Sequence, residues 1–351
     1  MIITMLTGSL ALRKYKTGVH VVHENILARF AEANYLGMDA KIACYCTQKD
    51  MENEYPEYVE EKYSNKIVFS HKITRVLMYF LPVELFFGKA DLYFCDGIIP
   101  HTLIHSKKIA LIHDLMVKIY PENYSLFKRI YLEIYYHFCK NADLVIAVSE
   151  TTKKDIIKYL HIEPDKIKVV YNGIDKKGKD KTIDASNMNI DFKQKYLLYI
   201  GDMRKNKNLI FALKAFEEVH KRDLNLKFYI AGAKKFEYEN LKNYVELHGL
   251  SEYVIFLGYV SNDEKVALYQ NAHALVFISE YEGFGIPILE AALYNLPVIT
   301  SDLSSMQEIG DGYVITVDPH NVMNIAKEIE RVSDTEFKNS IVEKQKSLID
   351  I

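Results

Sequence analysis

The stretch Glu282-Gly283-Phe284-Gly285-Ile286-Pro287-Ile288-Leu289-Glu290-Ala291 decides how the chain is interpreted, because it joins a glycine turn to a helix start. Pro287 predicts the first residue of that helix, where its missing N–H costs nothing. The two glycines allow a tight turn and close approach of a ligand to the backbone. The N–H groups and positive dipole end of such a helix start favour anions, phosphates above all.

The two carboxylates of this stretch stand eight residues apart, Glu282 in the loop and Glu290 about one turn into the helix. An acid at a phosphate-binding turn would repel the ligand, so we expect both to accept hydrogen bonds from hydroxyls flanking the phosphate. A ligand with hydroxyls on both sides of a phosphate is a nucleotide sugar. The alternative is a surface turn followed by an ordinary amphipathic helix, and the spacing alone does not decide between them.

Short apolar segments alternate with helical patterns along the whole chain, which indicates an α/β fold with parallel sheets. In the first half, the expected strands are residues 2–7, 40–45, 66–69, 92–95, 109–112, 144–148 and 168–171, with helices after Gly18 and over 124–139. In the second half, they are residues 196–201, 227–231, 254–257, 274–278 and 298–300, with helices over 208–220, 238–248, 263–271 and 322–332.

The length of 351 residues suits two domains. Residues 176–195 are polar and lysine-rich without a clear period, and we interpret them as a linker or surface loop. The predicted domains are therefore residues 1–175 and 196–332, with residues 333–351 as a C-terminal helical tail.

The composition is that of an ordinary globular protein, with 49% hydrophobic and 26% charged residues. A net charge of −3 gives no global attraction to nucleic acid, so we expect no nucleic-acid partner. Four cysteines form no C-x-x-C pair, and Cys44 and Cys46 fit core thiols, which favours a reducing, cytoplasmic compartment. The N-terminus lacks the features of a signal peptide. The longest apolar stretch, residues 76–87, is too short to span a bilayer.

A basic turn follows the strand that ends at Gly201, with Arg204, Lys205 and Lys207 within four residues. Three cations at a strand–helix junction suit a diphosphate clamp, and we expect Arg204 and Lys207 to be exposed. The alternative is a solvated basic turn.

Two further residues stand where an open α/β sheet meets its ligand. His113 follows the strand 109–112, and Gly18 lies between the first strand and the first helix. The alternatives are a hydrogen-bonded loop histidine and a glycine that merely starts a helix. The 12 histidines and the carboxylates show no metal-binding spacing such as H-E-x-x-H or D-x-D, so we expect no metal or other cofactor.

Glu282 to Glu290 with its glycines resembles the E-x7-E pattern of the retaining glycosyltransferases of family 4, also called glycosyl transferases group 1. Ile112-His113-Asp114-Leu115 with Tyr120-Pro121-Glu122 is similar to the histidine loop of their mannosyltransferase-like members. Further matches run in order from about Ile109 to Pro319, and they include Ala142-Asp143, Val148-Ser149-Glu150, Val170-Tyr171-Asn172-Gly173-Ile174-Asp175, Leu257-Gly258-Tyr259-Val260 and Leu296-Pro297-Val298-Ile299-Thr300-Ser301. The resemblance implies the GT-B fold, two Rossmann-like parallel α/β domains facing each other across a cleft.

The resemblance also implies roles for single residues. Glu282 would contact sugar hydroxyls, and Glu290 would hold the ribose hydroxyls. The backbone of Phe284, Gly285 and Ile286 would face the sugar and the diphosphate. Arg204 and Lys207 would clamp the diphosphate, and Gly18 would approach it from the other domain. His113 would lie at the sugar and acceptor side, and Tyr259 and Val260 would border the base. The segment after Gly201 is shorter than is usual in the family, so the choice between Arg204 and Lys205 stays open.

The implied reaction is retaining transfer of a hexose-like sugar (mannose, glucose, rhamnose or similar) from a nucleotide sugar to a glycan or lipid-linked glycan in cell-surface polysaccharide synthesis. Glu282, His113, Arg204 and Lys207 would be its catalytic residues. The alternatives are a nucleotide-sugar epimerase of the same shape and a non-catalytic nucleotide-sugar-binding partner protein. If the acceptor is lipid-linked, we expect residues 13–16 and 76–87 to contact the inner face of the membrane peripherally.

Overall fold

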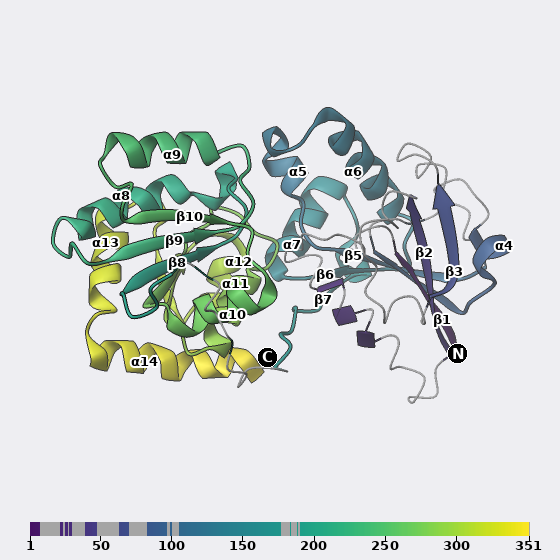
Figure 1. Ribbon diagram of the computed structural model, residues 1–351. Helices are drawn as coiled ribbons and strands as arrows, with labels where there is room; N and C mark the ends of the chain where they lie inside the picture. The colour runs from purple at the N-terminus through teal and green to yellow at the C-terminus, as the bar shows by residue number, and fades with distance from the viewer. Residues whose placement is uncertain are drawn as a thin grey trace. The chain divides into compact units, whose positions relative to one another are not determined.

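The computed structural model describes residues 1–7, 22, 23, 25, 26, 28, 29, 39–47, 63–69, 83–96, 99, 105–176, 183, 188 and 190–350. These residues form two compact units, Met1–Tyr171 and Asn172–Ile351, and each is described by itself (Figure 1).

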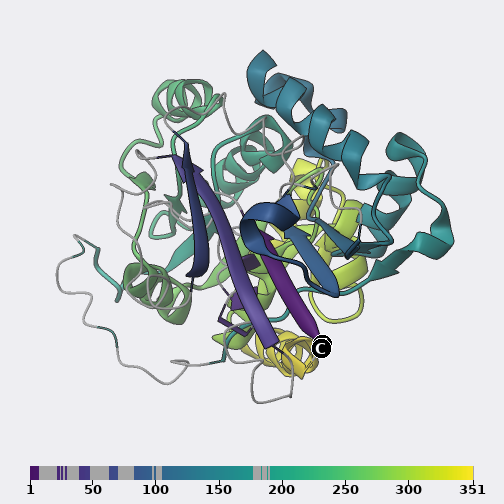
Figure 2. The same cartoon turned by 90° about the vertical axis from the view of Figure 1, so that its right-hand side faces the viewer.

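The first unit contains a seven-stranded parallel sheet with the order β3-β2-β1-β4-β5-β6-β7. Figure 2 shows β1, β2 and β3 in purple and blue, running side by side. The order reverses between β1 and β4, where Thr7 pairs with Asp96 at the carboxyl ends of the two strands. The strands are β1 (Ile2–Thr7), β2 (Asp39–Thr47), β3 (Tyr63–Phe69), β4 (Leu92–Asp96), β5 (Lys107–Ile112), β6 (Leu144–Ala147) and β7 (Ile167–Val169).

The helices of the first unit include α6 (Leu126–Cys139), which begins at Ser125, whose hydroxyl accepts a hydrogen bond from the Lys128 N–H. The buried residues of α6 lie in its second half, and one of them, Tyr135, donates a hydrogen bond to the carbonyl of Leu111 at 2.6 Å. Further helical segments of this unit are α4 (Val83–Phe87), α5 (Met116–Ile119), η4 (Pro121–Asn123), α7 (Glu150–Asp155), η5 (Ile156–Leu160) and η6 (Pro164–Lys166).

The second unit contains a six-stranded parallel sheet with the order β10-β9-β8-β11-β12-β13. This order reverses between β8 and β11, the point at which parallel α/β sheets bind ligands. The strands are β8 (Tyr196–Ile200), β9 (Lys227–Ala231), β10 (Val254–Gly258), β11 (Ala274–Phe277), β12 (Val298–Ser301) and β13 (Ile315–Val317). The helical segments are η7 (Lys205–Lys207), α8 (Leu209–His220), α9 (Tyr238–Leu247), α10 (Asn262–Asn271), α11 (Ile286–Leu293), α12 (Ser304–Gly310), α13 (Val322–Arg331), α14 (Thr335–Gln345) and η8 (Lys346–Asp350).

The central strands of the second unit are buried on both faces. Every residue of β11 is buried, as are Tyr196 to Tyr199 of β8. A strand covered on both faces is apolar throughout instead of alternating, and that run of apolar residues is what the sequence shows at both strands. The rings of Tyr196 and Tyr229 lie 4.7 Å apart between their centroids and fill the space beside β8 and β9.

A glycine lies at the carboxyl end of each of the neighbouring strands β8, β9 and β10. Gly232 has a φ of 141°, and a Cβ added there would lie 1.8 Å from the carbonyl oxygen of Gly201. Its N–H donates a hydrogen bond to the carbonyl of Gly258 at 2.7 Å. The backbones after β8, β9 and β10 therefore approach one another closely at this edge, which only glycine at position 232 permits.

The C-terminal helix is fastened to the second unit through Gln345. The side chain of Gln345 accepts a hydrogen bond from the Val298 N–H at 3.3 Å and donates one to the Leu296 carbonyl at 2.9 Å. Both partners stand at the start of β12, so this helix is fixed to the second unit beside that strand. Within the residues described, none of the helices has the length and apolar character needed to cross a bilayer.

Candidate functional site

The loop that follows β11 carries Glu282, and side chains from two other segments hold the backbone of this loop. The side-chain amide of Asn206, which follows β8, donates a hydrogen bond to the Tyr281 carbonyl at 3.0 Å. The hydroxyls of Ser304 and Ser305 at the start of α12 donate to the Glu282 carbonyl at 3.0 and 2.9 Å. The sheet therefore fixes this loop at the point where the strand order reverses.

Helix α11 begins immediately after this loop. Gly285 precedes its first turn with a φ of 101°, a left-handed conformation that favours glycine. The helix starts at Ile286, one residue before the start expected at Pro287, and Pro287 still lies in the first turn. Five of the eight residues of α11 are buried and pack it into the core. Its first N–H groups have no acceptor within the helix and form a favourable end for an anion.

Glu282 is paired with Lys207. The ammonium of Lys207, at the end of η7, contacts the Glu282 carboxylate, and the two side chains are only 13% and 14% exposed. The Lys207 ammonium also lies 5.5 Å from the centre of the Phe277 ring. The expectation that Lys207 would be a solvated loop residue is wrong, because the carboxylate and the ring cover it.

The rest of the basic turn is arranged differently. Arg204 is partly buried, not exposed as expected, and its Nε lies 2.8 Å from a carboxylate oxygen of Asp202. Lys205 is exposed. The contact of these residues with a diphosphate stays a prediction.

Glu290 is held by two side chains of α10. Lys265 Nζ lies 2.5 Å from one carboxylate oxygen, and the hydroxyl of Tyr269 donates a hydrogen bond to the other at 2.8 Å. Burial and the neighbouring Glu290 carboxylate raise the pKa of Tyr269 well above its ordinary value, so the hydroxyl keeps its proton. Sequence reasoning missed this role of Lys265 and Tyr269; the signal was their spacing, since residues four apart share one helix face.

The two carboxylates thus stand on either side of the α11 start, each oriented by its own lysine. Each ammonium balances the charge of a partly buried carboxylate, so the site can accept an anion without a net negative charge opposing it. The carboxylate oxygens remain hydrogen-bond acceptors, which suits hydroxyls on both sides of a phosphate.

The first unit holds a second cluster, at the reversal between β1 and β4. The buried carboxylate of Asp96, the last residue of β4, contacts Nδ1 of His23, and Nε2 of His113 lies 3.4 Å from its other oxygen. Although burial opposes it, the two histidines hold the pKa of Asp96 well below its usual range. Burial would lower the pKa of His113, but the charges of Asp96 and Asp114 outweigh it and raise that pKa.

Asp96 and His23 were not expected from the sequence, in which they lie 73 residues apart. His113 lies after β5 as expected, and its side chain is 14% exposed, so it remains accessible at one edge. Gly18 and residues 13–16 lie outside the described residues, as does most of the stretch 76–87.

The residues expected near the base and sugar lie at the same edge of the second sheet. Tyr259 and Val260 directly follow β10, Tyr259 exposed and Val260 half-buried. The side chain of Phe284 is buried, and the role of its backbone stays a prediction. In the parts of the chain that the structure covers, no three His, Cys, Asp or Glu side chains gather as metal ligands would.

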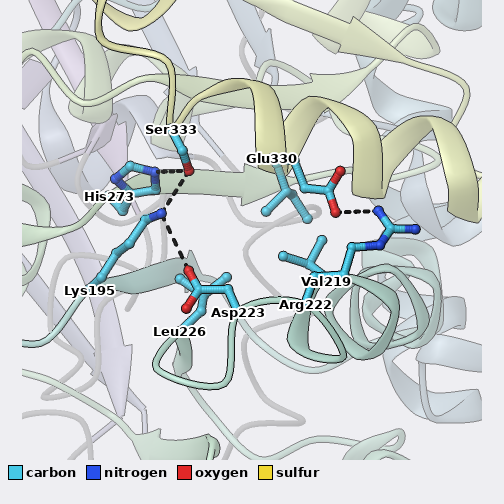
Figure 3. Close-up of a pocket in the computed structure, with 9 residues that line it drawn as sticks. Lys195, Val219, Arg222, Asp223, Leu226, His273, Glu330 and Ser333 are labelled. Carbon is cyan, nitrogen blue, oxygen red and sulfur yellow. Dashed lines mark hydrogen bonds and ion pairs between the residues drawn. The ribbon is translucent and has the colours of Figure 1, made fainter.

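A pocket of about 310 Å³ opens at the opposite edge of the second unit (Figure 3). It lies at the amino ends of the strands, since Lys195, Leu226 and His273 each precede a strand. Burial, together with the charge of Lys195, lowers the pKa of His273 to about 4, so this histidine is neutral. The pocket is lined by Lys195, Val219, Arg222, Asp223, Leu226, His273, Ile329, Glu330 and Ser333, none of which belongs to the candidate site.

Two models of known protein families match the chain. The family model described as Glycosyl transferases group 1 matches residues 180–349, and the model described as Glycosyltransferase Family 4 matches residues 10–177. Each model covers most of one unit, and together they span nearly the whole chain. The chain belongs to the family 4 glycosyltransferases. The family expected from the E-x7-E stretch is therefore confirmed.

Two curated relatives of this family 4 member are similar over part of their length. The O-antigen chain mannosyltransferase RfbU of Salmonella typhimurium is 31% identical over 237 residues, which are 66% of this chain and 63% of RfbU. An uncharacterized glycosyltransferase of Methanocaldococcus jannaschii is 31% identical over 216 residues, which are 58% of this chain and 54% of that protein. The matches thus span between half and two thirds of these relatives, and the match to RfbU supports the mannosyltransferase-like resemblance.

A solved structure resembles the family 4 chain over its full length. The Anabaena protein HepE, crystallised with UDP and glucose, superposes with a TM-score of 0.75 at 18% identity, covering 100% of this chain and 95% of HepE. At this identity the likeness concerns the fold alone. Together with the two parallel sheets, it confirms the expected α/β GT-B fold.

Proposed function

We propose that this protein is a retaining glycosyltransferase that moves a hexose-like sugar from a nucleotide sugar to a glycan or lipid-linked glycan during cell-surface polysaccharide synthesis. The proposal places the enzyme in the cytoplasm, with peripheral contact to the inner face of the membrane. It assigns the neutralisation of the leaving group to the protein's own cations, without a metal ion.

One observation carries the proposal: Glu282 and Glu290 stand on either side of the α11 start, each held by its own lysine. A structural turn followed by a surface helix does not require two partly buried ion pairs at one helix end. A diphosphate at the α11 N-terminus would have the sugar hydroxyls toward Glu282 and the ribose toward Glu290. The comparisons support the substrate class, since RfbU is a mannosyltransferase and HepE binds UDP and glucose.

The chemistry needs stabilisation of an oxocarbenium-like sugar and of a leaving diphosphate. The developing positive charge of the sugar is a task for the Glu282 carboxylate. The negative charge of the leaving diphosphate is a task for Arg204, Lys207 and the α11 start, which are fixed before the reaction. The acceptor hydroxyl loses its proton as its oxygen bonds to the sugar carbon, and we propose that the leaving phosphate oxygen takes that proton.

Binding and turnover of candidate donors test the proposal. A thermal-shift screen of GDP-, UDP- and dTDP-linked hexoses should find one donor class that adds about 2.7 kcal/mol of stability at roughly 100 times its Kd. NMR of the sugar first released from that donor should show the anomeric configuration of the donor, in buffer with or without excess chelator. Inversion would contradict retention, and loss of activity restored by metal would contradict metal independence. Interconversion of the free donor would indicate an epimerase, and binding without hydrolysis or transfer would indicate a binding protein.

A further inference from the structure

The pocket at the amino ends of β8, β9 and β11 combines apolar walls with two charged pairs. Lys195 and Asp223 lie on one side of it, and Arg222 and Glu330 lie on the other (Figure 3). The apolar side chains of the lining are all buried, and they are Val219, Leu226 and Ile329. Pockets that bind small molecules have this composition, with mostly apolar walls and a few polar groups that orient the ligand.

Lys195 is held in the pocket by a hydroxyl. Its Nζ donates a hydrogen bond to Oγ of Ser333 at 2.7 Å, while the carboxylate of Asp223 lies 3.6 Å away. Nε2 of the neutral His273 lies 3.3 Å from the same Ser333 oxygen and can accept a hydrogen bond from that hydroxyl. Among the described residues, Ser333 is thus the one acceptor at hydrogen-bond distance from an ammonium that has three donors. The other donors are available to a ligand.

Lys338 of α14 adds a positive charge that no carboxylate of the pocket balances. Burial and the charge of Lys195 lower the pKa of Lys338, so the two ammonium groups act on each other. Over the part of the chain that the structure describes, no carboxylate lies within ion-pair distance of Lys338. Lys195 and Arg222 each face one carboxylate. The charge in excess around the pocket is therefore positive.

We propose that this pocket binds a small organic anion, a carboxylate or a phosphate monoester with an apolar body. Lys195 donates hydrogen bonds to the charged group, and Lys338, which lies outside the lining, adds its positive field. The apolar body packs on Val219, Leu226 and Ile329. A volume of about 310 Å³ holds roughly ten groups of the size of water, at about 30 Å³ each. The ligand is therefore larger than inorganic phosphate and smaller than a nucleotide sugar.

Helix α8 separates this pocket from the candidate donor site. The helix starts two residues after Lys207, which pairs with Glu282, and its last turn supplies Val219 to the pocket. Its 12 residues span about 18 Å at about 1.5 Å per residue. A ligand that fills the pocket does not reach across this length, so the anion is a second ligand and not part of the donor.

Calorimetric titration of the full protein with model anions tests the proposal. The probes are benzoate and phenyl phosphate, with benzamide as the uncharged molecule of the same shape as benzoate. At least one of the two anions should bind at millimolar concentrations or below, and at least tenfold more tightly than benzamide, because hydrogen bonds to charged groups are the stronger ones. Binding of benzoate alone would identify a carboxylate site, and binding of phenyl phosphate alone a phosphate site.

Variants of the two lysines locate the bound anion. Lys195→Gln should weaken its binding at least tenfold, and Lys338→Gln roughly fivefold, since Lys338 acts through its field alone. Lys338→Gln should melt no lower than the wild type, because it removes a half-buried charge without a partner. Lys242→Gln, a change at an exposed lysine of α9, is the matched control and should bind the anion like the wild type.

Two further measurements separate this pocket from the donor site and from apolar binding. Lys207→Ala should bind the anion with wild-type affinity, because Lys207 belongs to the other edge of the sheet. In NMR titrations the pKa of His273 should rise when the anion is bound, because its charge offsets those of Lys195 and Lys338.

Equal affinity for benzamide and the anions would overturn the proposal, as would inorganic phosphate that binds as tightly as phenyl phosphate. Unchanged binding in Lys195→Gln, or a loss in Lys207→Ala as large as in Lys195→Gln, would place the anion elsewhere and overturn it too. The same holds if neither anion binds at millimolar concentrations.

Discussion

The ammonium of Lys207 and the carboxylate of Glu282 form an ion pair between the loops that follow β8 and β11. These two strands are neighbours at the reversal of the strand order, so the pair joins the two sides of the site. The family resemblance implies that Lys207 contacts the diphosphate and that Glu282 contacts the sugar. If the proposed roles hold, this contact would place the cation for the diphosphate beside the anion for the sugar.

Removal of Lys207 tests its electrostatic role. We expect Lys207→Ala, and likewise Arg204→Ala, to lower turnover roughly a hundredfold or more, as loss of a transition-state charge partner does. Lys205→Ala is the matched control, because Lys205 lies in the same turn and is exposed; it should react at close to the wild-type rate. Wild-type turnover in Lys207→Ala, or equal losses in all three variants, would show that the clamp is misassigned.

The Asp96 cluster predicts a pH dependence. The folded-state pKa of His113 is raised, so its pairing stabilises the protein below the ordinary histidine pKa of about 6.5 and the stabilisation is lost as the pH rises through the raised value. The pKa of Asp96 is lowered, so its contribution is present above about 3.9 and lost as the pH falls through the lowered value.

Asp96→Asn should therefore destabilise the protein by about 3 kcal/mol near neutral pH, because it leaves the histidines without their carboxylate. Urea unfolding measures this loss, and NMR titration of the His113 ring should show its pKa falling in the variant. Glu122→Gln, an exposed change in the same unit, serves as the control. A His113 pKa that is unchanged by Asp96→Asn would contradict the pairing.

Gly232 tests the packing that supports the site. A Cβ at this position would lie 1.8 Å from the Gly201 carbonyl oxygen, in a backbone conformation that other residues rarely adopt. We expect Gly232→Ala to destabilise the protein by about 2 kcal/mol or more. Gly173→Ala places its Cβ in open space and should be nearly neutral. Equal urea midpoints for the two variants would argue against the close approach.

Much of this structure can be predicted from local sequence patterns. The apolar runs of β8 and β11 and the Gly285–Pro287 turn place strands and a helix from residues that are close in sequence, so the sequence predicts them to within one or two positions. Strand β13 has only three residues, and α12 is short, so neither has a pattern long enough to recognise. Both lie outside the expected elements.

The site was predictable where family resemblance supplied it, and not where distant residues meet. Glu282 and Lys207 were each proposed, but their contact joins positions 75 residues apart. The Lys265–Glu290 pair and the His23–Asp96 pair depend on how helices and strands pack, which no single-residue preference encodes. The same reason explains why Lys207 is covered: its polarity indicates exposure, and only the fold brings a carboxylate over it.

Steady-state kinetics of Glu282→Gln and Glu290→Gln against donor concentration test the central claim most directly. Glu290 would hold the ribose, which changes little during the reaction, so its loss should mostly raise the KM for donor. Glu282 would contact the sugar, which gains positive charge as the bond breaks, so its loss should mostly lower kcat. If both variants change kcat and KM by no more than the roughly 0.5 kcal/mol usual for surface changes, the stretch 282–291 is only a turn followed by a helix. Interchanged effects would show that the two carboxylates have the opposite roles.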